Sequence, residues 1–261
     1  MPVLLALSLS LGLLLPGAST AAASPITRHA ASVVEEQIGG QRAVVATPRT
    51  PTDKVVVVAH GAGRDAVTMM ADIPTIAGAL LAHGYTVVTS DAHGNNWGSP
   101  AGRRDYAAVA QEMRRRGLDR VYVLARSMGG LATLAAMRQI HPLAWAGIYP
   151  ACNLRSLSRF REGISRAYGV PWRRLERARR LSPIRPQGVA GMPMIFWASS
   201  HDTVVRKAAN TDRCAAAARR AGAHVTVVTT RGDHGDPSNV DPPRLTAFFD
   251  AADAATAGTR R

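Results

Sequence analysis

The feature that most limits the possible folds is an alternation of valine- and isoleucine-rich runs with helical patterns. Strand-like runs occupy residues 54–61, 85–94, 120–127, 143–152, 192–202 and 223–235. Helical patterns lie between or after them, at residues 66–84, 102–117, 128–141, 206–222 and 242–253. Continuous apolar strands that alternate with helices are typical of a mostly parallel sheet with helices on both faces. We therefore expect an α/β fold with its functional loops at the carboxyl ends of the strands.

Two segments depart from this alternation. Residues 32–48 have the pattern of a β-hairpin with Gly39 and Gly40 at the turn. Residues 153–190 are rich in Arg, Ser and Pro, and we expect them to form a cap or lid-like insertion. The chain has 261 residues, and its sequence contains no internal repeat or low-complexity linker. It therefore predicts one domain over residues 24–261.

Residues 1–23 have the composition of a secretory signal peptide. An apolar core precedes Pro16-Gly17 and a run of small residues, and cleavage after Ala23 fits the preference for small residues at the cleavage site. No basic residue precedes Arg28, so an uncleaved anchor and a misassigned start codon are the alternatives. We expect a secreted or cell-envelope protein.

The two cysteines of the chain, Cys152 and Cys214, fit an exported protein. An even number of cysteines in that compartment predicts a disulfide, and two separate buried thiols are the alternative. A loop of about 60 residues closed in this way stabilises a protein by roughly 4 kcal/mol in the chain-entropy model. Neither cysteine lies next to a histidine, which argues against a thiol nucleophile.

The formal net charge of +14 predicts attraction to anionic surfaces. The sequence has no zinc-finger spacing, RNP-like run or interleaved aromatic and basic residues, so we expect no specific nucleic-acid site. The arginine clusters at residues 114–116 and 172–180 are predicted to form solvated faces.

Groups with catalytic chemistry stand at or just after the ends of the predicted strands. Ser127 ends the run "VYVLARS", Asp202 ends "MIFWASSHD", and His234 follows the last strand in "GDHG". The first strand runs into "HGAG" at residues 60–63. Because these strand ends share one edge of a parallel sheet, we expect the serine, the carboxylate and the histidine to meet there.

From about residue 40 onward, the chain resembles a serine α/β-hydrolase of the esterase/lipase kind. The motifs that carry the resemblance are "HGAG" (60–63), "ARSMGG" (125–130), "SSHDTVV" (199–205) and "GDHGDPS" (232–238). The usual elbow around the nucleophile in this family is G-x-S-x-G, and this chain has Ala125 at the first position. A small residue is required there because the turn is tight. The resemblance implies the α/β-hydrolase fold.

The resemblance also implies a role for each site residue. Ser127 would be the nucleophile, His234 the general base and Asp202 the carboxylate that orients the histidine. The backbone N–H groups of Ala62 and Met128 would form the oxyanion hole. No cofactor is implied, and the sequence has no HExxH, CxxC or paired His/carboxylate spacing that would predict a metal site.

Other polar residues near these strand ends have less reactive interpretations. Asp91 also ends a strand, but the acidic residue of the family lies later in the chain, which favours Asp202. Asp233 adjoins His234, and neighbouring side chains rarely point the same way, so we expect a loop contact. By the resemblance, His60 holds the oxyanion loop and His93 is a loop histidine near the mouth of the site. We expect His201 to be an exposed turn residue.

The aromatic residues leave two interpretations open. Trp97 is either an apolar wall for an acyl group or an ordinary surface-loop residue. Phe160, Tyr168 and Trp172 either line a substrate groove or anchor the insertion to the body of the domain, and the anchor is favoured. Trp145 and Trp197 lie inside strand runs and are predicted to be core.

The sequence thus predicts a monomeric, secreted serine hydrolase that cleaves carboxylic esters through an acyl-enzyme. Its substrate would be a small-molecule, lipid or polymer ester. Peptide or amide cleavage and acyl transfer use the same three residues and are the nearest alternatives. A non-catalytic basic protein that binds an anionic polymer on the same scaffold is an alternative of a different class.

Overall fold

The computed structural model describes residues 24–178, 181 and 184–258. The predicted signal peptide, residues 1–23, lies outside the described residues. Within the described part, no helix has the length and apolar content needed to cross a membrane.

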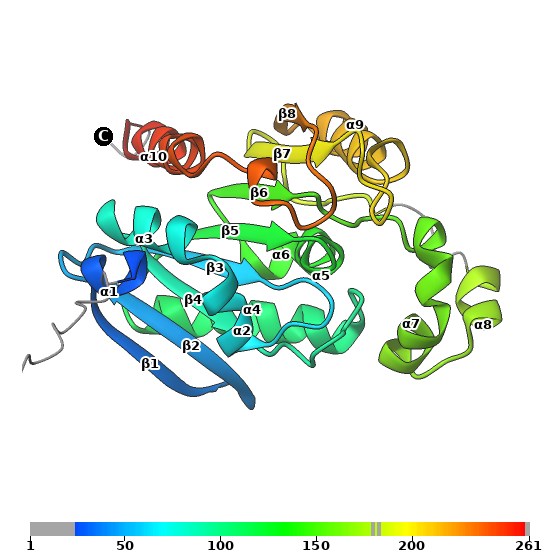
Figure 1. The fold of residues 1–261 in the computed structure, drawn as a ribbon, viewed down its shortest axis with the longest axis horizontal. Helices are drawn as coiled ribbons and strands as arrows, with labels where there is room; N and C mark the ends of the chain where they lie inside the picture. Colours follow the sequence, from blue (N-terminus) through cyan, green and yellow to red (C-terminus); the bar gives the residue numbers. More distant parts are fainter. Residues whose placement is uncertain (1–23, 179–180, 182–183, 259–261) are drawn as a thin grey trace, which may run out of the picture.

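The described strands form one eight-stranded sheet in the order β1-β2-β4-β3-β5-β6-β7-β8 (Figure 1). Their bounds are β1 Ala30–Ile38, β2 Gln41–Pro48, β3 Lys54–Ala59, β4 Thr86–Ser90, β5 Arg120–Arg126, β6 Ala144–Ile148, β7 Pro193–Ser199 and β8 His224–Thr230. Strands β3 to β8 pair in parallel, whereas β2 is antiparallel to both β1 and β4. The prediction of a mostly parallel sheet is confirmed.

The predicted hairpin is formed by β1 and β2. Gly39 and Gly40 connect them with φ angles of 61° and 78°. A two-residue turn with both φ angles positive matches the right-handed twist of the strands, and glycine adopts that conformation at little steric cost.

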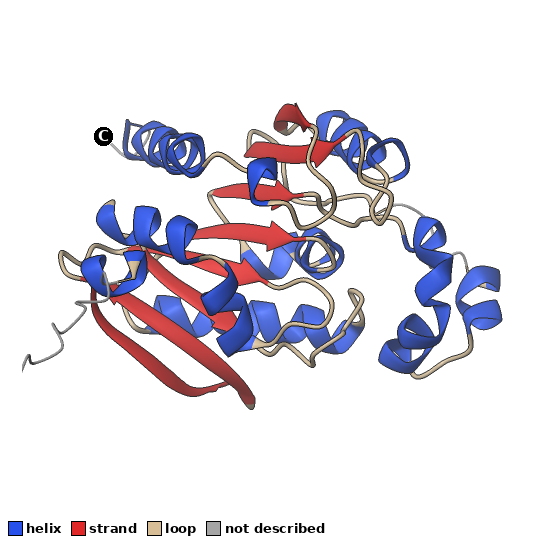
Figure 2. Ribbon diagram, in the orientation of Figure 1, coloured by secondary structure: helices blue, strands red, loops and turns tan. Residues whose placement is uncertain are grey.

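Helices cover both faces of the sheet, as Figure 2 shows. One face packs against α4 (Pro100–Arg115), α5 (Gly129–Ala135), α6 (Met137–Ile140) and α9 (Thr211–Arg220). The other packs against α1 (Pro25–His29), α2 (Ala66–Asp72), α3 (Pro74–Ala82) and α10 (Pro242–Gly258). This two-sided burial explains why the central strands are apolar along their whole length.

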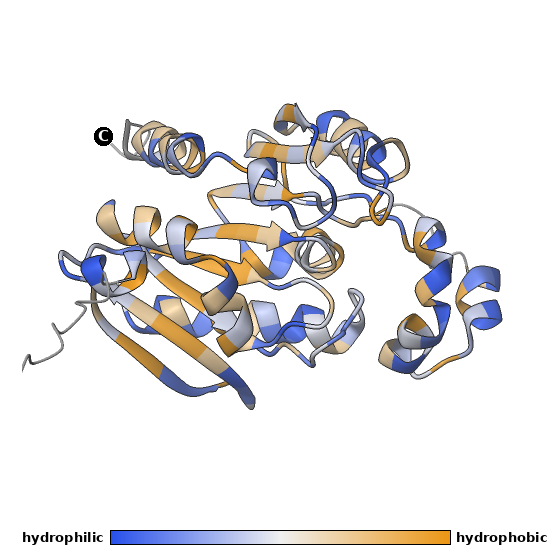
Figure 3. Ribbon diagram, in the orientation of Figure 1, coloured by the Kyte–Doolittle hydropathy of each residue, from blue (hydrophilic) through white to orange (hydrophobic). Residues whose placement is uncertain are grey.

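Strand β3 shows how the two cores are divided. Val55 and Val57 pack into one apolar cluster, and Val56 and Val58 pack into the other. Successive side chains of a strand point to opposite faces, so a run of four valines supplies both cores. The apolar strands in the middle of the sheet are visible in Figure 3.

Three predicted helices differ from the structure. The pattern at residues 66–84 forms two helices, because Pro74 lacks the N–H that a continuing helix needs and instead begins α3. The pattern at 128–141 is divided at Ala136 into α5 and α6. The pattern at 206–222 becomes helical only from Thr211, after a short 3₁₀ turn at Lys207–Ala209 (η2).

Asn210 explains the late start of α9. Its side-chain oxygen accepts hydrogen bonds from the backbone N–H groups of Cys152 and Asn153, each at 3.1 Å. Asn210 is fully buried. A tertiary contact to the chain after β6 therefore fixes where this helix can begin.

The segment between β6 and β7 projects beyond the carboxyl ends of β5 to β7 (Figure 1). Its described elements are a 3₁₀ segment, η1 (Leu154–Phe160), and two helices, α7 (Arg161–Tyr168) and α8 (Trp172–Arg177). Leu154, Leu157 and Ile164 pack with Trp97 and Met128 of the main body in a third apolar cluster.

Cys152 and Cys214 form a disulfide, with Cα atoms 6.5 Å apart. The bond joins the chain just after β6, where the insertion begins, to helix α9. It therefore fastens the base of the insertion to the main body of the domain.

Candidate active site

Three loops at the carboxyl edge of the sheet bring Ser127, Asp202 and His234 together. Ser127 follows β5, Asp202 follows β7 and His234 follows β8. Because β5 to β8 are neighbouring parallel strands, loops that are far apart in sequence emerge side by side.

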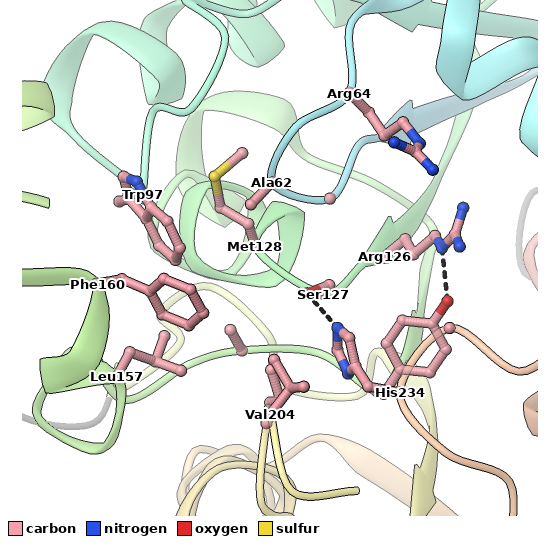
Figure 4. Close-up of a pocket in the computed structure, with 15 residues that line it drawn as sticks. Ala62, Arg64, Trp97, Arg126, Ser127, Met128, Leu157, Phe160, Val204 and His234 are labelled. Atoms are coloured by element: carbon pink, nitrogen blue, oxygen red, sulfur yellow. Dashed lines mark hydrogen bonds between the residues drawn. The ribbon is translucent and has the colours of Figure 1, made fainter. Parts of the chain in front are cut away.

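The three side chains form a continuous chain of hydrogen bonds. Ser127 Oγ lies 3.0 Å from His234 Nε2, and His234 Nδ1 lies 2.7 Å from Asp202 Oδ2. The bond between Ser127 and His234 is drawn in Figure 4. If Asp202 accepts the Nδ1 proton, Nε2 is left as an acceptor facing the serine hydroxyl. That arrangement can remove a proton from Ser127.

The backbone at Ser127 has the sharp geometry expected between a strand and a helix. Its φ angle is 49°, in the left-handed region that non-glycine residues rarely adopt. The close packing of the following helix also explains the glycine at position 129, because a Cβ there would lie 2.4 Å from the carbonyl oxygen of Ala59. Ala125 is fully buried, so its small size suits the same tight turn. A positive φ angle at a non-glycine residue such as Ser127 is a backbone strain typical of functional positions.

Asp202 is held as a buried carboxylate. Its Oδ1 accepts hydrogen bonds from the backbone N–H groups of Val204 and Val205, each at 2.8 Å. Burial alone would raise the pKa of Asp202, but the hydrogen bond from His234 and those from the two backbone N–H groups outweigh it and lower the pKa. Asp202 is therefore ionised wherever the protein is folded at neutral pH.

Ala62 and Met128 line the same pocket as Ser127 and lie together on one side of it (Figure 4). Within the described residues, neither of their backbone N–H groups donates to a protein acceptor. The loop that carries Ala62 is tied down on its far side, because Gly63 N donates to Asn95 Oδ1 at 2.7 Å. Two such donors beside a nucleophile are suited to bind a developing negative charge.

The pocket around Ser127 has a volume of about 360 Å³. One end is apolar and is formed by Trp97, Leu157, Phe160 and Val204. Trp97 and Phe160 stack with ring centroids 5.0 Å apart, so a residue of the main body meets a residue of the insertion there.

Trp97 is buried and lines the pocket, so the alternative of an ordinary surface-loop residue is wrong. Phe160 also lines the pocket. Tyr168 has an anchoring contact, since its hydroxyl donates to the carbonyl oxygen of Gly98 at 3.0 Å. Trp172 packs against the apolar cluster of the insertion. Phe160 therefore fits the interpretation of a groove-lining residue, whereas Tyr168 and Trp172 fit the interpretation of anchors. Trp145 and Trp197 are buried in the core, as predicted.

Asp91 and Asp233 lie outside the hydrogen-bonded chain of Ser127, His234 and Asp202. Asp91 Oδ1 accepts from the backbone N–H of Ala66 at 2.8 Å, and its carboxylate pairs with Arg42 at 3.2 Å. Asp233 is exposed, and its carbonyl oxygen accepts from Asn239 Nδ2. The Asp91 carboxylate therefore has structural partners, whereas Asp233 is held in its loop through its backbone carbonyl.

The other candidate histidines also have identifiable surroundings. His60 is fully buried, and its ring nitrogens lie 2.8 Å from the carbonyl oxygen of Gly61 and 2.9 Å from that of Asp91. It thus connects the loop after β3 to the loop after β4. His93 Nδ1 is 2.5 Å from Asp105 Oδ2, and His201 is exposed.

The arginine clusters are only partly solvated. Residues 173, 174 and 177 on α8 are exposed, in agreement with the expectation. In the other cluster, Arg114 donates to the carbonyl oxygens of Ile140 and His141, and Arg116 pairs with Glu36 and Glu112. The expectation of a solvated face is therefore wrong for Arg114, which is half-buried and whose acceptors belong to a distant part of the chain, whereas Arg116 is exposed in agreement with it.

The sequence predicts no role for three polar residues of this pocket: Arg64, Arg126 and Tyr149. The Tyr149 ring packs 4.5 Å from the His234 ring, and its hydroxyl accepts from Arg126 Nε at 2.5 Å. Arg64 directly follows "HGAG", and Arg126 directly precedes Ser127. Their positions beside these two motifs were the signal in the sequence that could have placed them at the site.

Among the described residues, no group of three or more His, Cys, Asp and Glu side chains is placed to hold a metal ion. The polar groups that this site brings together are a hydrogen-bonded serine, histidine and carboxylate.

The sheet order, the helices on both faces and the loops at the carboxyl edge define an α/β-hydrolase fold. No family model and no curated protein matches the chain by sequence. The comparison with known proteins therefore rests on solved structures of similar fold.

A hormone-sensitive lipase from a metagenome library has a TM-score of 0.66 and 15% identity, and the match covers 86% of this chain and 87% of that one. An esterase of Pyrococcus furiosus has a TM-score of 0.60 and 14% identity, over 84% and 91% of the two chains. A puromycin-hydrolyzing peptidase of Mycobacterium tuberculosis has a TM-score of 0.65 and 20% identity, over 84% of this chain and 38% of the peptidase. These likenesses support the α/β-hydrolase fold.

Proposed function

We propose that this protein is a serine hydrolase that cleaves carboxylic esters through an acyl-enzyme. The observation that carries the proposal is the chain of hydrogen bonds from Ser127 through His234 to Asp202, with distances of 3.0 Å and 2.7 Å. The esterases and lipases among the similar structures support the choice of an ester over other acyl compounds.

In the first step, Ser127 Oγ attacks the carbonyl carbon of the ester while His234 Nε2 takes the hydroxyl proton. The electron pair of the C=O bond moves to its oxygen, which the N–H groups of Ala62 and Met128 stabilise. Asp202 stabilises the imidazolium that forms on His234, and its lowered pKa keeps it ionised for this role.

The tetrahedral intermediate then collapses. The bond to the alcohol oxygen breaks, His234 gives its proton to the departing alcohol, and the acyl group stays on Ser127. A water molecule next gives a proton to His234 and attacks the acyl carbon. Ser127 leaves with that proton, and the carboxylic acid is released. Each cycle therefore consumes one ester and one water.

The remaining assignments extend the proposal to the whole chain. Residues 153–190 act as a cap over the apolar end of the pocket, which Leu157 and Phe160 support by lining it. Residues 1–23 are a signal peptide, and the disulfide between Cys152 and Cys214 supports a secreted or cell-envelope location. The protein acts as a monomer on a small-molecule, lipid or polymer ester, and its charge of +14 attracts it to anionic surfaces.

Amide cleavage is the second candidate, because one similar structure is that of a puromycin-hydrolyzing peptidase. The same residues would act, with His234 giving its proton to a departing amine. A p-nitroanilide matched in its acyl group to each ester separates the two activities.

The decisive experiment compares the wild-type protein with Ser127→Ala on p-nitrophenyl esters from acetate to palmitate. We expect the variant to lose about 10³-fold or more in kcat. Ser32→Ala, which alters an exposed serine of β1, is the matched control and should retain wild-type rates. A burst of p-nitrophenol equal to the enzyme concentration would support the acyl-enzyme.

Full activity in Ser127→Ala would overturn the proposal. If the wild type hydrolyses neither ester nor amide, and binds anionic polymers in a manner that salt abolishes, the non-catalytic alternative takes its place.

A further inference from the structure

The end of the pocket opposite the apolar wall contains two arginines that share one carboxylate. Arg64 Nε lies 2.5 Å from Asp72 Oδ2, and Arg126 Nη1 lies 2.9 Å from the same oxygen. Two guanidinium groups and one carboxylate leave one net positive charge. Arginine stays protonated in proteins, so this charge is present at all ordinary pH values.

The uncompensated charge faces the pocket. Arg64 and Arg126 both line it, together with Ser127, whereas Asp72 does not. Among the described residues that line this pocket, none is an aspartate or glutamate. Figure 4 shows both arginine side chains on one side of Ser127, with Trp97, Phe160 and Leu157 on the other.

The two arginines also keep donors for a ligand. The side-chain contacts of Arg126 use Nε, to the Tyr149 hydroxyl, and Nη1, to Asp72. Those of Arg64 use Nε, to Asp72, and a long contact of 3.4 Å from Nη1 to the carbonyl oxygen of Gly63. Within the described residues, the Nη2 group of each has no partner.

A purely structural role accounts for Arg126 better than for Arg64. Arg126 holds the Tyr149 hydroxyl, and its side chain is 18% exposed. The Arg64 side chain is 45% exposed, and among the described residues its polar contacts beyond its own loop are limited to Asp72. A second arginine at this place is therefore not needed to fix Tyr149 or His234.

We infer that the pocket selects esters that carry a carboxylate, with Arg64 and Arg126 as the residues that bind it. This inference rests on the proposed ester hydrolysis at Ser127. The planar donors of a guanidinium match the two oxygens of a carboxylate, and such charge-assisted bonds are about twice as strong as neutral ones. An apolar part of the same substrate would lie against Trp97 and Phe160.

The kinetic test uses matched pairs of esters that differ in charge. Mono-p-nitrophenyl adipate and p-nitrophenyl hexanoate place a carboxylate or a methyl group at the end of the acyl chain. 4-Carboxyphenyl butyrate and 4-carbamoylphenyl butyrate place a carboxylate or an amide on the alcohol side. The quantity to measure is the ratio of kcat/KM for the charged ester to that for its neutral partner.

We expect Arg64→Gln and Arg126→Gln each to lower this ratio by about tenfold or more for at least one pair. Arg104→Gln, on the exposed side of α4, removes the same charge outside the pocket and should leave the ratio unchanged. A change confined to the adipate pair would assign the carboxylate to the acyl group. A change confined to the carboxyphenyl pair would assign it to the alcohol.

If the arginines only hold Tyr149 and His234 in place, their substitution would leave the ratio unchanged, because a misplaced His234 slows the hydrolysis of both esters of a pair. Arg64→Gln is the safer variant, since Arg64 lies in an exposed loop and does not contact Tyr149. If both variants keep the wild-type ratio for both pairs, the inference is overturned.

A binding measurement separates this inference from the proposed function. In a Ser127→Ala background, calorimetry would compare adipate with adipamide. Preferential binding of adipate that Arg64→Gln weakens about tenfold would support the anion site even if no ester is hydrolysed. Equal binding of adipate and adipamide would overturn the site, whatever the protein hydrolyses.

Discussion

The pocket around Ser127 has two walls with different construction. One consists of loops that leave the parallel strands, and it holds Ser127, His234 and Asp202 through hydrogen bonds of 3.0 Å and 2.7 Å. The other belongs to the insertion between β6 and β7 and contributes Leu157 and Phe160 through apolar contacts.

The difference lies in how precisely each wall is positioned. Hydrogen bonds are directional, and the backbones that carry the first wall are tied into the sheet ladder. Apolar packing depends mainly on volume and tolerates exchange of one side chain for another of similar size. We therefore expect changes in the first wall to affect the rate of bond cleavage and changes in the second to affect the choice of substrate.

The largest effect on the rate of hydrolysis should come from Asp202→Asn, a change in the first wall. An amide cannot stabilise the imidazolium and favours the wrong tautomer of His234, so we expect kcat to fall by about 10³- to 10⁴-fold. Asp233→Asn, which alters the exposed carboxylate next to His234, is the control and should stay within twofold. A rate within tenfold of the wild type for Asp202→Asn would exclude Asp202 as the orienting acid.

The attachment of the second wall is tested by Cys152→Ala/Cys214→Ala. The disulfide spans 62 residues, and a loop of that length predicts a loss of roughly 4 kcal/mol in the free energy of unfolding. Urea denaturation measures this loss. The kcat of the folded variant on p-nitrophenyl acetate should stay within about threefold of the wild-type value. A loss below about 1 kcal/mol would show that apolar packing alone fastens the insertion.

Phe160→Ala should alter selectivity rather than chemistry. Removing the ring opens the apolar end of the pocket and takes away an apolar contact for the acyl chain. The ratio of kcat/KM for p-nitrophenyl hexanoate to that for p-nitrophenyl acetate should therefore fall about tenfold. Phe248→Ala, which removes a half-buried phenyl ring on the far face of the sheet, should leave the ratio unchanged. An unchanged ratio for Phe160→Ala would place the acyl chain elsewhere.

The smallest effect concerns stability against pH. The pKa of Asp202 is lowered in the folded protein, so its ionised form contributes stability above the ordinary aspartate pKa of about 3.9 and loses it as pH falls further. The stability difference between wild type and Asp202→Asn, which cannot titrate at this position, should therefore shrink between pH 5 and pH 3. Urea denaturation across this range measures it, and a constant difference would contradict the pKa direction.

Much of the fold was predictable because local signals and the tertiary structure agree. The valine runs marked the central strands, and Gly39-Gly40 marked the hairpin turn. The structure also brings Ser127, Asp202 and His234 together as expected, although their catalytic roles stay predictions. The order of these residues at strand ends was sufficient because parallel strands direct their loops to one edge.

What the sequence did not reveal depends on contacts between distant residues. The late start of α9 follows from Asn210 accepting bonds from Cys152 and Asn153, some 57 residues away. The burial of Trp97 depends on a stacking partner in the insertion. Arg64 and Arg126 stand beside recognisable motifs, but only the folded chain shows that both share Asp72 and face one pocket.

The disulfide between Cys152 and Cys214 closes a covalent ring that contains the insertion, β7 and Asp202. The exposed arginines of α8 lie within this ring and are suitable targets for a trypsin-like protease. A single cut there opens the ring but releases neither fragment, so the nicked chain would still migrate as one species until it is reduced. A cut in α8 thus leaves Asp202 covalently joined to Ser127 through the disulfide.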